Sequence, residues 1–211
     1  MNRLPGTVRQ LIAALRGLLL FTVICGIIYP VVMFGIAQAA FHNQANGSLV
    51  SFHGRVVGSS LLCQEFTDAK GNPLAPYFQP RPSAATSGAK NDYGCDPGFS
   101  AASNLGPDNP DLVTAIKAQQ AQIAKFDHVS VSRIPPDAVT ASASGLDPYI
   151  SPQNAAIQVN RVAAARHISP AAVAALVSQH TQGRTLGFLG EPRVNVLMLN
   201  IALDQRYPVA G

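Results

Sequence analysis

A stretch of 25 residues without a charged side chain, at positions 17–41, constrains the fold of this chain most strongly. As an α-helix it would be roughly 37 Å long, whereas the hydrocarbon core of a bilayer is about 30 Å thick. A cleaved signal peptide is the alternative, because Ala37-Gln38-Ala39 fits the cleavage pattern. The apolar core of a signal peptide, however, is usually only about 7–15 residues long. The length therefore predicts a retained transmembrane helix, which we assign to residues 17–39.

Basic residues lie on one side of this segment. Arg3, Arg9 and Arg16 precede it, and the first 16 residues contain no acidic side chain. Because positively charged flanks tend to stay in the cytoplasm, residues 1–16 are expected to form a cytoplasmic tail. Residues 40–211 then form a domain on the other side, the periplasm of a bacterium. Of the net charge of +4, the domain and the span carry only +1, so a nucleic-acid-binding surface is not expected.

Three residues within the span bear on helix packing. Pro30 removes a backbone hydrogen bond and is expected to bend the helix, and a neighbouring helix often satisfies the freed carbonyl in a membrane. Thr22 and Gly26 are four residues apart and predict a small-residue face for close packing, although small residues are common in such helices. All three are candidate interface residues. One span without ionisable side chains forms no ion path, so a transport path would belong to another chain.

The region after the span is long enough for one domain with its own core, and its pattern predicts an α+β fold that is helix-rich in its second half. Residues 49–66 are rich in apolar residues between glycines and predict one or two strands. Residues 71–110 contain seven prolines and five glycines and follow no regular period. They predict a long, ordered loop. Its expected aromatic anchors are Tyr77, Phe78, Tyr93 and Phe99.

Three helices are predicted to begin with a polar cap followed by proline, at Asn109-Pro110, Ser151-Pro152 and Ser169-Pro170. A fourth is predicted from the apolar run at 194–203. The positions expected on the inner faces of these helices are Leu112, Ile116, Gln119, Ile123 and Phe126; Ala155, Ala156, Val159, Val162 and Ala163; Val173, Leu176 and Val177; and Val194, Leu197, Met198 and Ile201.

Two of the three cysteines, Cys63 and Cys95, lie outside the span. Exported thiols usually pair, so we expect a disulfide between them. A disulfide that closes the loop between these two cysteines would stabilise the fold by roughly 3–4 kcal/mol in the chain-entropy treatment. Two buried, unpaired thiols are the alternative.

The usual signatures of catalysis are weak or missing. Ser87-Gly88-Ala89-Lys90 matches S-x-x-K, but its companions S-D-N and K-T-G are absent. The five histidines show no H-E-x-x-H spacing, and no phosphate-binding G-x-x-x-x-G-K-[ST] motif occurs. Ser144, His180 and Asp147 could form a hydrolytic triad, but nothing in the sequence selects them. We therefore predict neither a catalytic nor a metal-binding residue.

Seven motifs remain to be explained. They are Tyr29-Pro30, QANGSL at 44–49, YFQPRPSA at 77–84, SNLGP at 103–107, VTASASGLDP at 139–148, QVNRVA at 158–163 and GEPRVNV at 190–196. Two of them, 103–107 and 140–148, are clusters of small polar residues that fit turns or a docking surface. Together and in this order, the motifs resemble the C subunit of the Kdp-type potassium-transporting ATPase of bacteria. Asn160 departs from the family, which usually has proline there, and residues 70–72 and 92–98 look like local variations.

The resemblance implies a non-catalytic subunit of a complex in the bacterial inner membrane. The implied partners are an ATP-hydrolysing P-type pump subunit, a potassium-binding, channel-like subunit, a very small membrane peptide and the lipid bilayer, but no nucleic acid. The family's C subunit is described as a chaperone-like component that raises the ATP affinity of the pump subunit. ATP is thus expected to act through the partner, with no cofactor bound by this chain alone. With the domain outside, the effect would be indirect, through coupling across the membrane; the opposite orientation is the alternative, because charge bias is a tendency.

Within the matching motifs, Gln158 and Arg161 are the candidates for contact with a nucleotide. The candidate interface residues of the domain are Arg81, Ser83, Ser103, Asn104, Ser144, Gly145, Asp147 and Asn195. Two other classes stay open, a membrane-anchored periplasmic hydrolase and a solute-binding or structural envelope protein. A hydrolase would depend on one nucleophile, and a solute-binding protein would not co-purify with a pump.

Overall fold

The computed structural model describes residues 5–89 and 92–209. The chain divides into two compact units, Met1–Ser48 and Leu49–Gly211. Arg3 of the basic tail and Lys90 of the S-x-x-K match lie outside the described residues.

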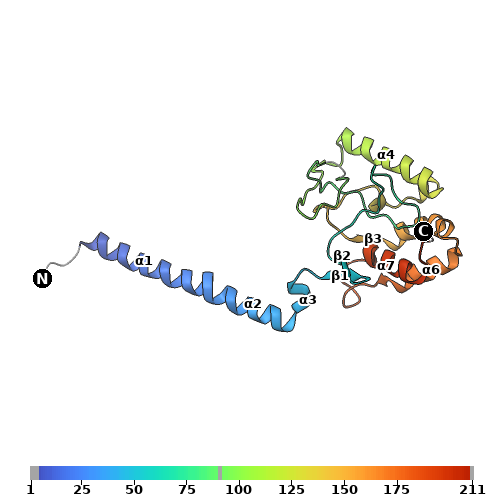
Figure 1. The fold of residues 1–211 in the computed structure, drawn as a ribbon. Coiled ribbons are helices and arrows are strands. Elements are labelled where there is room, and N and C mark those ends of the chain that lie inside the picture. Colours follow the sequence, from blue (N-terminus) through green and yellow to red (C-terminus); the bar gives the residue numbers. More distant parts are fainter. Residues whose placement is uncertain (1–4, 90–91, 210–211) are drawn as a thin grey trace. The chain divides into compact units, whose positions relative to one another are not determined.

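The first unit is built on one long apolar helix. It comprises α1 (Gly6–Val23), a π-helical turn η1 (Ile24–Ile28) and α2 (Tyr29–Ala40), followed by the short α3 (His42–Ala45). Together α1, η1 and α2 form a continuous helix of 35 residues (Figure 1). Within residues 5–89 and 92–209, it is the one helix that length and composition would allow to cross a membrane.

The π-helical turn η1 accommodates Pro30. The N–H of Tyr29, next to the proline, donates to the carbonyl of Ile24, five residues back. A proline ring collides with the carbonyl four residues before it and supplies no N–H of its own. A turn with five-residue hydrogen bonds is wider than an α-turn, and the helix therefore continues past the proline. The helix is thus locally wider just before Pro30, and the bend expected there stays a prediction.

In its described residues, the second unit combines small antiparallel sheets with longer helices, which confirms the α+β prediction (Figure 1). Strands β1 (Leu49–Phe52) and β2 (Arg55–Ser59) form a hairpin. Strands β3 (Tyr149–Ile150), β5 (Arg193–Asn195) and β4 (Thr181–Gln182) form a sheet in the order β3-β5-β4. The helices are α4 (Pro110–Asp127), α5 (Pro152–Ala165), α6 (Pro170–Gln179) and α7 (Val196–Arg206), with 3₁₀ turns η2 (Val131–Arg133) and η3 (Pro136–Ala138).

The three predicted caps are confirmed by hydrogen bonds at the helix starts. The side chain of Asn109 accepts from the N–H of Asp111, Ser151 from Asn154 and Ser169 from Ala172. In each helix proline occupies the first position. An N–H at this position would have no partner within the helix, so the proline costs no hydrogen bond. Short-range sequence signals therefore set the start of α4, α5 and α6.

Two predicted inner faces need correction. On α5, Ala156 is exposed and Ile157 is buried in its place. The run 194–203 is not one helix, because Val194 belongs to β5 and Asn195 accepts from the N–H of Met198 to cap α7. The helix therefore starts at Val196, two residues later than expected. Its buried residues are Val196, Leu197, Leu199, Asn200 and Leu203, so the predicted inner position Leu197 is confirmed, whereas Met198 is 38% exposed.

The core of the second unit packs α5, α6 and α7 against β3, β5 and one residue of the long loop. That residue is Phe78, which has no exposed surface. Between Ser59 and Pro110, the described residues form neither a helix nor a named strand. This confirms the loop predicted at 71–110, whereas the strands predicted within 49–66 end at Ser59. Its aromatic anchors differ from the prediction: Tyr77 is half-buried, whereas Tyr93 and Phe99 are 42% and 52% exposed. Cys63 and Cys95, which both lie within the stretch between Ser59 and Pro110, form the predicted disulfide.

Candidate functional site

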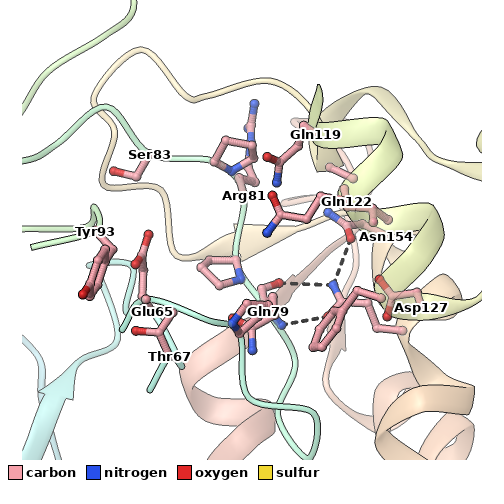
Figure 2. A pocket seen from close by; sticks show the side chains of 18 residues that line it. Glu65, Thr67, Gln79, Arg81, Ser83, Tyr93, Gln119, Gln122, Asp127 and Asn154 are labelled. Atoms are coloured by element: carbon pink, nitrogen blue, oxygen red, sulfur yellow. Dashed lines mark hydrogen bonds between the residues drawn. The ribbon is translucent and has the colours of Figure 1, made fainter. Parts of the chain in front are cut away.

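A polar cavity of about 300 Å³ lies between the long loop, α4 and the first turns of α5 (Figure 2). This volume is at the lower end of the range of small-molecule pockets. Side-chain amides dominate the polar part of its wall, and Gln119 and Gln122 extend into it from α4. The other polar side chains that line it are Glu65, Thr67, Gln79, Arg81, Ser83, Tyr93, Asp127, Asn154 and Gln158.

One wall of the cavity is held in place by Gln158. Its Oε1 accepts from the backbone N–H of Gln79 at 2.7 Å, and its Nε2 donates to the carbonyl of Gln79 at 3.2 Å. The same amide donates to Asn154 at 3.0 Å. Gln79 in turn donates from its side chain to the carbonyls of Phe66 and Leu74. The amide of Gln158 therefore serves as a hydrogen-bonding edge for an extended backbone that has no strand beside it.

Beneath this wall lies a buried ion pair. Arg161 Nε is 2.7 Å from Asp127 Oδ1, and both side chains are 5% exposed. Arg161 also donates to the carbonyls of Ala75 and Tyr77 at 2.6 and 2.8 Å and to Gln158 Oε1 at 2.7 Å. Its guanidinium lies 4.4 Å from the ring centroid of Phe126. All three nitrogens of the guanidinium are thus occupied by the fold.

Two further side chains hold the same stretch of loop. Arg166 donates to the carbonyls of Pro76 and Tyr207 and pairs with Asp204 at 2.8 Å. Asn200 of α7 accepts from the N–H of Phe78 and donates to its carbonyl, both at 2.9 Å. Residues 75–79 are therefore anchored through their backbone by α5 and α7, which explains how a proline-rich segment reaches the core.

A second set of contacts joins the loop to the turn at 140–148. Arg81 pairs with Asp147 at 3.1 Å and donates to the carbonyl of Thr140. The Ser83 hydroxyl donates to the carbonyl of Gly145 at 2.7 Å and accepts from the N–H of Cys95 at 2.8 Å. These contacts place the two polar motifs side by side and position Arg81 at the rim of the cavity.

Gly145 is required at this junction by its conformation and by its surroundings. Its φ is +70°, and an added Cβ would lie 2.6 Å from the carbonyl oxygen of Ala101 and 2.8 Å from the nitrogen of Ala85. The adjacent carbonyl of Ser144 accepts from Ala101 N–H at 3.0 Å. A side chain at position 145 would push these backbones apart.

Burial changes the acidity of three groups around the cavity. It raises the pKa of Glu65, and the nearby negative charge of Asp92 adds to the effect. Burial also raises the pKa of Asp127, although Arg161 acts in the opposite direction, and it lowers the pKa of Arg161. Loss of solvation disfavours the charged form of each group. Removing Asp127 or Arg161 would therefore leave the other as a buried charge without its partner.

The structure brings together most of the residues singled out from the sequence. Gln158, Arg81 and Ser83 line the cavity, whereas Arg161 lies behind its wall and Ser144, Gly145 and Asp147 support its rim. Ser103 and Asn104 are exposed. Asn195 is buried and donates to the carbonyl of Ser60 at 2.8 Å. Thr22, Gly26 and Pro30 belong to the first unit.

The three side chains that could have formed a hydrolytic triad make other contacts. Ser144 Oγ accepts from the N–H of Leu146, and the Asp147 carboxylate is shared by Tyr149 N–H and Arg81. His180 Nδ1 is 3.2 Å from the carbonyl of Leu176. Ser144 and Asp147 thus have the turn-forming role that small polar residues commonly have, while His180 contacts the last turn of α6.

Sequence reasoning missed Asp127, Glu65, Arg166 and Asn200. Asp127 follows Ile123 and Phe126 on the inner face of α4, and this was the one available signal for its burial. The other three sit in patterns that fit an ordinary solvent-exposed side chain.

Comparison with known proteins gives a consistent result. The family model described as "KdpC: K+-transporting ATPase, c chain" matches residues 11–205. The "Potassium-transporting ATPase KdpC subunit" of Kineococcus radiotolerans is 47% identical over 205 residues, which cover 97% of this chain and 98% of that protein. Proteins of the same description from Geobacter metallireducens and Mycobacterium tuberculosis are each 48% identical. Those matches cover 92% and 93% of this chain and 97% and 98% of the relatives.

Proposed function

The chain belongs to the KdpC family of K+-transporting ATPase c chains, and from this premise we propose that it is a non-catalytic subunit that assembles with and stabilises an ATP-driven potassium-uptake complex. The observation that carries the proposal is the near full-length relationship, which includes the apolar helix as well as the cavity. The partners are the ATP-hydrolysing P-type subunit, the potassium-binding, channel-like subunit and the very small membrane peptide.

We further propose that the chain raises the ATP affinity of the pump subunit without holding ATP itself. Gln158 and Arg161 are the candidates for direct contact, but their hydrogen-bonding groups are engaged with Gln79, Asn154, Asp127 and two loop carbonyls. A phosphate at Arg161 would have to displace Asp127, and a buried carboxylate left alone is strongly unfavourable. Polar groups committed to the fold therefore favour an indirect effect.

The proposed location is the bacterial inner membrane, with the N-terminus in the cytoplasm and the second unit in the periplasm. Two observations support this orientation. Arg9 and Arg16 precede the apolar core of the helix, and basic flanks favour the cytoplasmic side. The disulfide between Cys63 and Cys95 suits an oxidising compartment.

The assembly proposal is tested by purifying the tagged chain in mild detergent from cells that express the whole complex. The P-type subunit and the potassium-binding subunit should co-purify in a fixed ratio. Deleting the chain should abolish potassium-stimulated ATP hydrolysis of the remaining subunits. A chain that purifies alone, with transport unchanged by its deletion, contradicts the proposal.

Two measurements test the indirect effect and the orientation. Calorimetry of the full chain in detergent should give no saturable heat with ATP at low micromolar concentration, while adding the chain lowers the KM of the pump subunit for ATP. Protease added to spheroplasts should digest the second unit and leave cytoplasmic proteins intact. Tight ATP binding together with protection from protease would establish direct nucleotide contact in the cytoplasm instead.

A further inference from the structure

The polar side chains around the cavity fall into two groups. The first group makes hydrogen bonds that hold the fold, and its members are Gln79, Arg81, Ser83, Asp127, Asn154 and Gln158. The second group comprises Glu65, Thr67, Gln119 and Gln122. Within residues 5–89 and 92–209, these four side chains make no hydrogen bond or ion pair. Part of the wall is therefore engaged in the structure, and part is available to a ligand.

Glu65 gives the cavity an uncompensated acidic group. The other charged residues of the lining are paired, Arg81 with Asp147 and Asp127 with Arg161, and each pair carries no net charge. Glu65 is half-buried and has no basic partner in the described part of the chain. A carboxylate that loses water without gaining a partner is disfavoured, and burial accordingly raises its pKa. A positively charged ligand would supply the missing partner.

A second carboxylate makes the surroundings of Glu65 more negative. Asp92 accepts from the hydroxyl of Ser87 at 2.6 Å and from the N–H of Gly94 at 3.3 Å. The hydrogen bonds from Ser87 are the largest cause that lowers the pKa of Asp92 to about 2. Asp92 therefore stays ionised at neutral pH, and its charge acts on Glu65. This charge favours a cation in the cavity and disfavours a phosphate.

The two amides on α4 indicate a different chemistry at another wall. Gln119 and Gln122 are three positions apart, so they share one face of the helix, and both extend into the cavity (Figure 2). An amide donates and accepts, and it therefore matches a neutral group that does the same, such as a carboxamide or a hydroxyl. Glu65 and Thr67 belong to the long loop instead. The ionic and the neutral contacts thus come from separate elements.

The size of the cavity distinguishes an organic ligand from a bare ion. A metal ion requires several oxygens in one shell at contact distance. A cavity of about 300 Å³ whose uncommitted groups come from two walls suits a longer molecule with two different ends.

We propose that this cavity binds a small organic ammonium compound that also carries a carboxamide or hydroxyl group. The ammonium group donates to the carboxylate of Glu65 and to the hydroxyl of Thr67. The neutral group exchanges hydrogen bonds with Gln119 and Gln122. Because charge-assisted hydrogen bonds are roughly twice as strong as neutral ones, Glu65 supplies most of the affinity and the two amides supply selectivity. The ligand binds the chain itself, independently of its assembly with a pump.

The first test uses 4-aminobutanamide, which has an ammonium group at one end and a carboxamide at the other. Saturation-transfer NMR with the full chain in detergent, in potassium-free buffer at pH 7, should show saturable binding that detergent alone does not give. Pentanamide, in which a methyl group replaces the ammonium, should bind at least about tenfold more weakly. No saturable binding, which would mean that the cavity holds water only, or equal affinity for both compounds would overturn the proposal.

The second test removes the charge at the cavity. E65Q keeps the size of the side chain and should lower the affinity for 4-aminobutanamide at least about tenfold. The matched control is D108N, which removes an exposed carboxylate close to the start of α4 and should leave the affinity unchanged. Both variants should form the disulfide between Cys63 and Cys95. Wild-type affinity in E65Q, or an equal loss in D108N, would contradict the role of Glu65.

The third test separates the two ends of the ligand. Q119A/Q122A should weaken binding of 4-aminobutanamide but not of butylamine, which lacks the carboxamide, whereas E65Q should weaken both. Q120A, on the same helix but outside the cavity lining, is the control. An equal response of both compounds to Q119A/Q122A would contradict the proposed orientation.

A competition experiment distinguishes an inorganic cation from an organic one. Displacement of 4-aminobutanamide by potassium chloride, but not by tetramethylammonium chloride at the same concentration, would identify an inorganic-ion site and overturn the proposal. These titrations are independent of the proposed function, which fails only if the chain does not assemble with the pump.

Discussion

Gln158 and Gln79, which are 79 residues apart in the chain, form a reciprocal pair of hydrogen bonds between a side-chain amide and a backbone. The amide reproduces the donor and acceptor that a neighbouring strand would offer. Asn200 does the same for Phe78 from α7. The long loop therefore crosses the second unit as an extended segment stabilised by side chains rather than by a sheet.

Replacing Gln158 with alanine should destabilise the second unit by about 2–3 kcal/mol, because it leaves partly buried backbone groups of Gln79 and one buried Arg161 nitrogen without partners. Urea unfolding of the full chain in detergent, followed by circular dichroism, measures the change. The control is Gln122→Ala, which removes an exposed amide from the same cavity and should stay within ~0.5 kcal/mol of wild type. Equal effects of both variants would contradict the role assigned to Gln158.

Breaking the ion pair should have a larger effect. Asp127→Ala leaves the guanidinium of Arg161 buried without its counter-charge, and such losses are about 3–5 kcal/mol. Asp108→Ala removes an exposed carboxylate close to the start of α4 and should be near neutral. In a double-mutant cycle with Arg161→Met, the combined loss should be smaller than the sum, since the second substitution removes the unpaired charge. Strict additivity would show that the two residues do not interact.

The parts of the fold that sequence predicted well depend on neighbouring residues. Asn109, Ser151 and Ser169 each cap a helix within three residues, and proline follows each of them. The buried positions of α6 were predicted from the helical spacing of its apolar residues. That spacing can be recognised within a short stretch of sequence. Even the error at 194–203 is local, because Asn195, which lies inside the predicted helix, is the residue that caps α7.

The candidate site was less predictable because its contacts join distant segments. Arg81 meets Asp147 across 66 positions, and Arg161 meets Asp127 across 34. A charged side chain is expected at the surface unless its partner is known, and the partner is set by how α4 packs on α5. Resemblance to a family directed attention to Gln158 and Arg161, but it did not indicate that they hold the loop.

Alanine substitutions at two glycines can separate the effect of backbone conformation from the effect of steric crowding. Gly145 and Gly88 have φ values of +70° and +74°, but an added Cβ meets nothing within 4 Å at Gly88. Gly88→Ala should therefore lose only about 1 kcal/mol from the strained conformation. Gly145→Ala adds contacts below 3 Å with two backbone segments and should lose more than ~2 kcal/mol. Thermal unfolding of both variants checks the order, and a reversed order would refute the close approach.

Glu65 predicts a pH-dependent effect. Its pKa is raised in the folded state by burial and by Asp92, so its contribution to stability is fully present below the unfolded pKa and is lost as the pH rises through the folded pKa. Glu65→Gln, which resembles the protonated acid, should raise Tm at pH 7 by about 2 °C, a small gain because the carboxyl is partly solvated. The gain should disappear near pH 4. A gain that grows on acidification would show that the pKa shift has the opposite sign.

The last prediction concerns the membrane helix and rests on the proposed assembly. An added Cβ at Gly26 would contact only Thr22 Cγ2, at 3.9 Å, so a larger side chain fits within the helix itself. Gly26→Leu should nevertheless lower recovery of the partner subunits about tenfold, because it fills the small-residue face on which another helix packs. Gly35→Leu is the matched control, since Gly35 lies in α2 and a Cβ there meets nothing within 4 Å. The second unit should unfold at the wild-type temperature in both variants. Wild-type recovery with Gly26→Leu, or an equal loss with Gly35→Leu, would mean that helix packing does not depend on the face formed by Thr22 and Gly26.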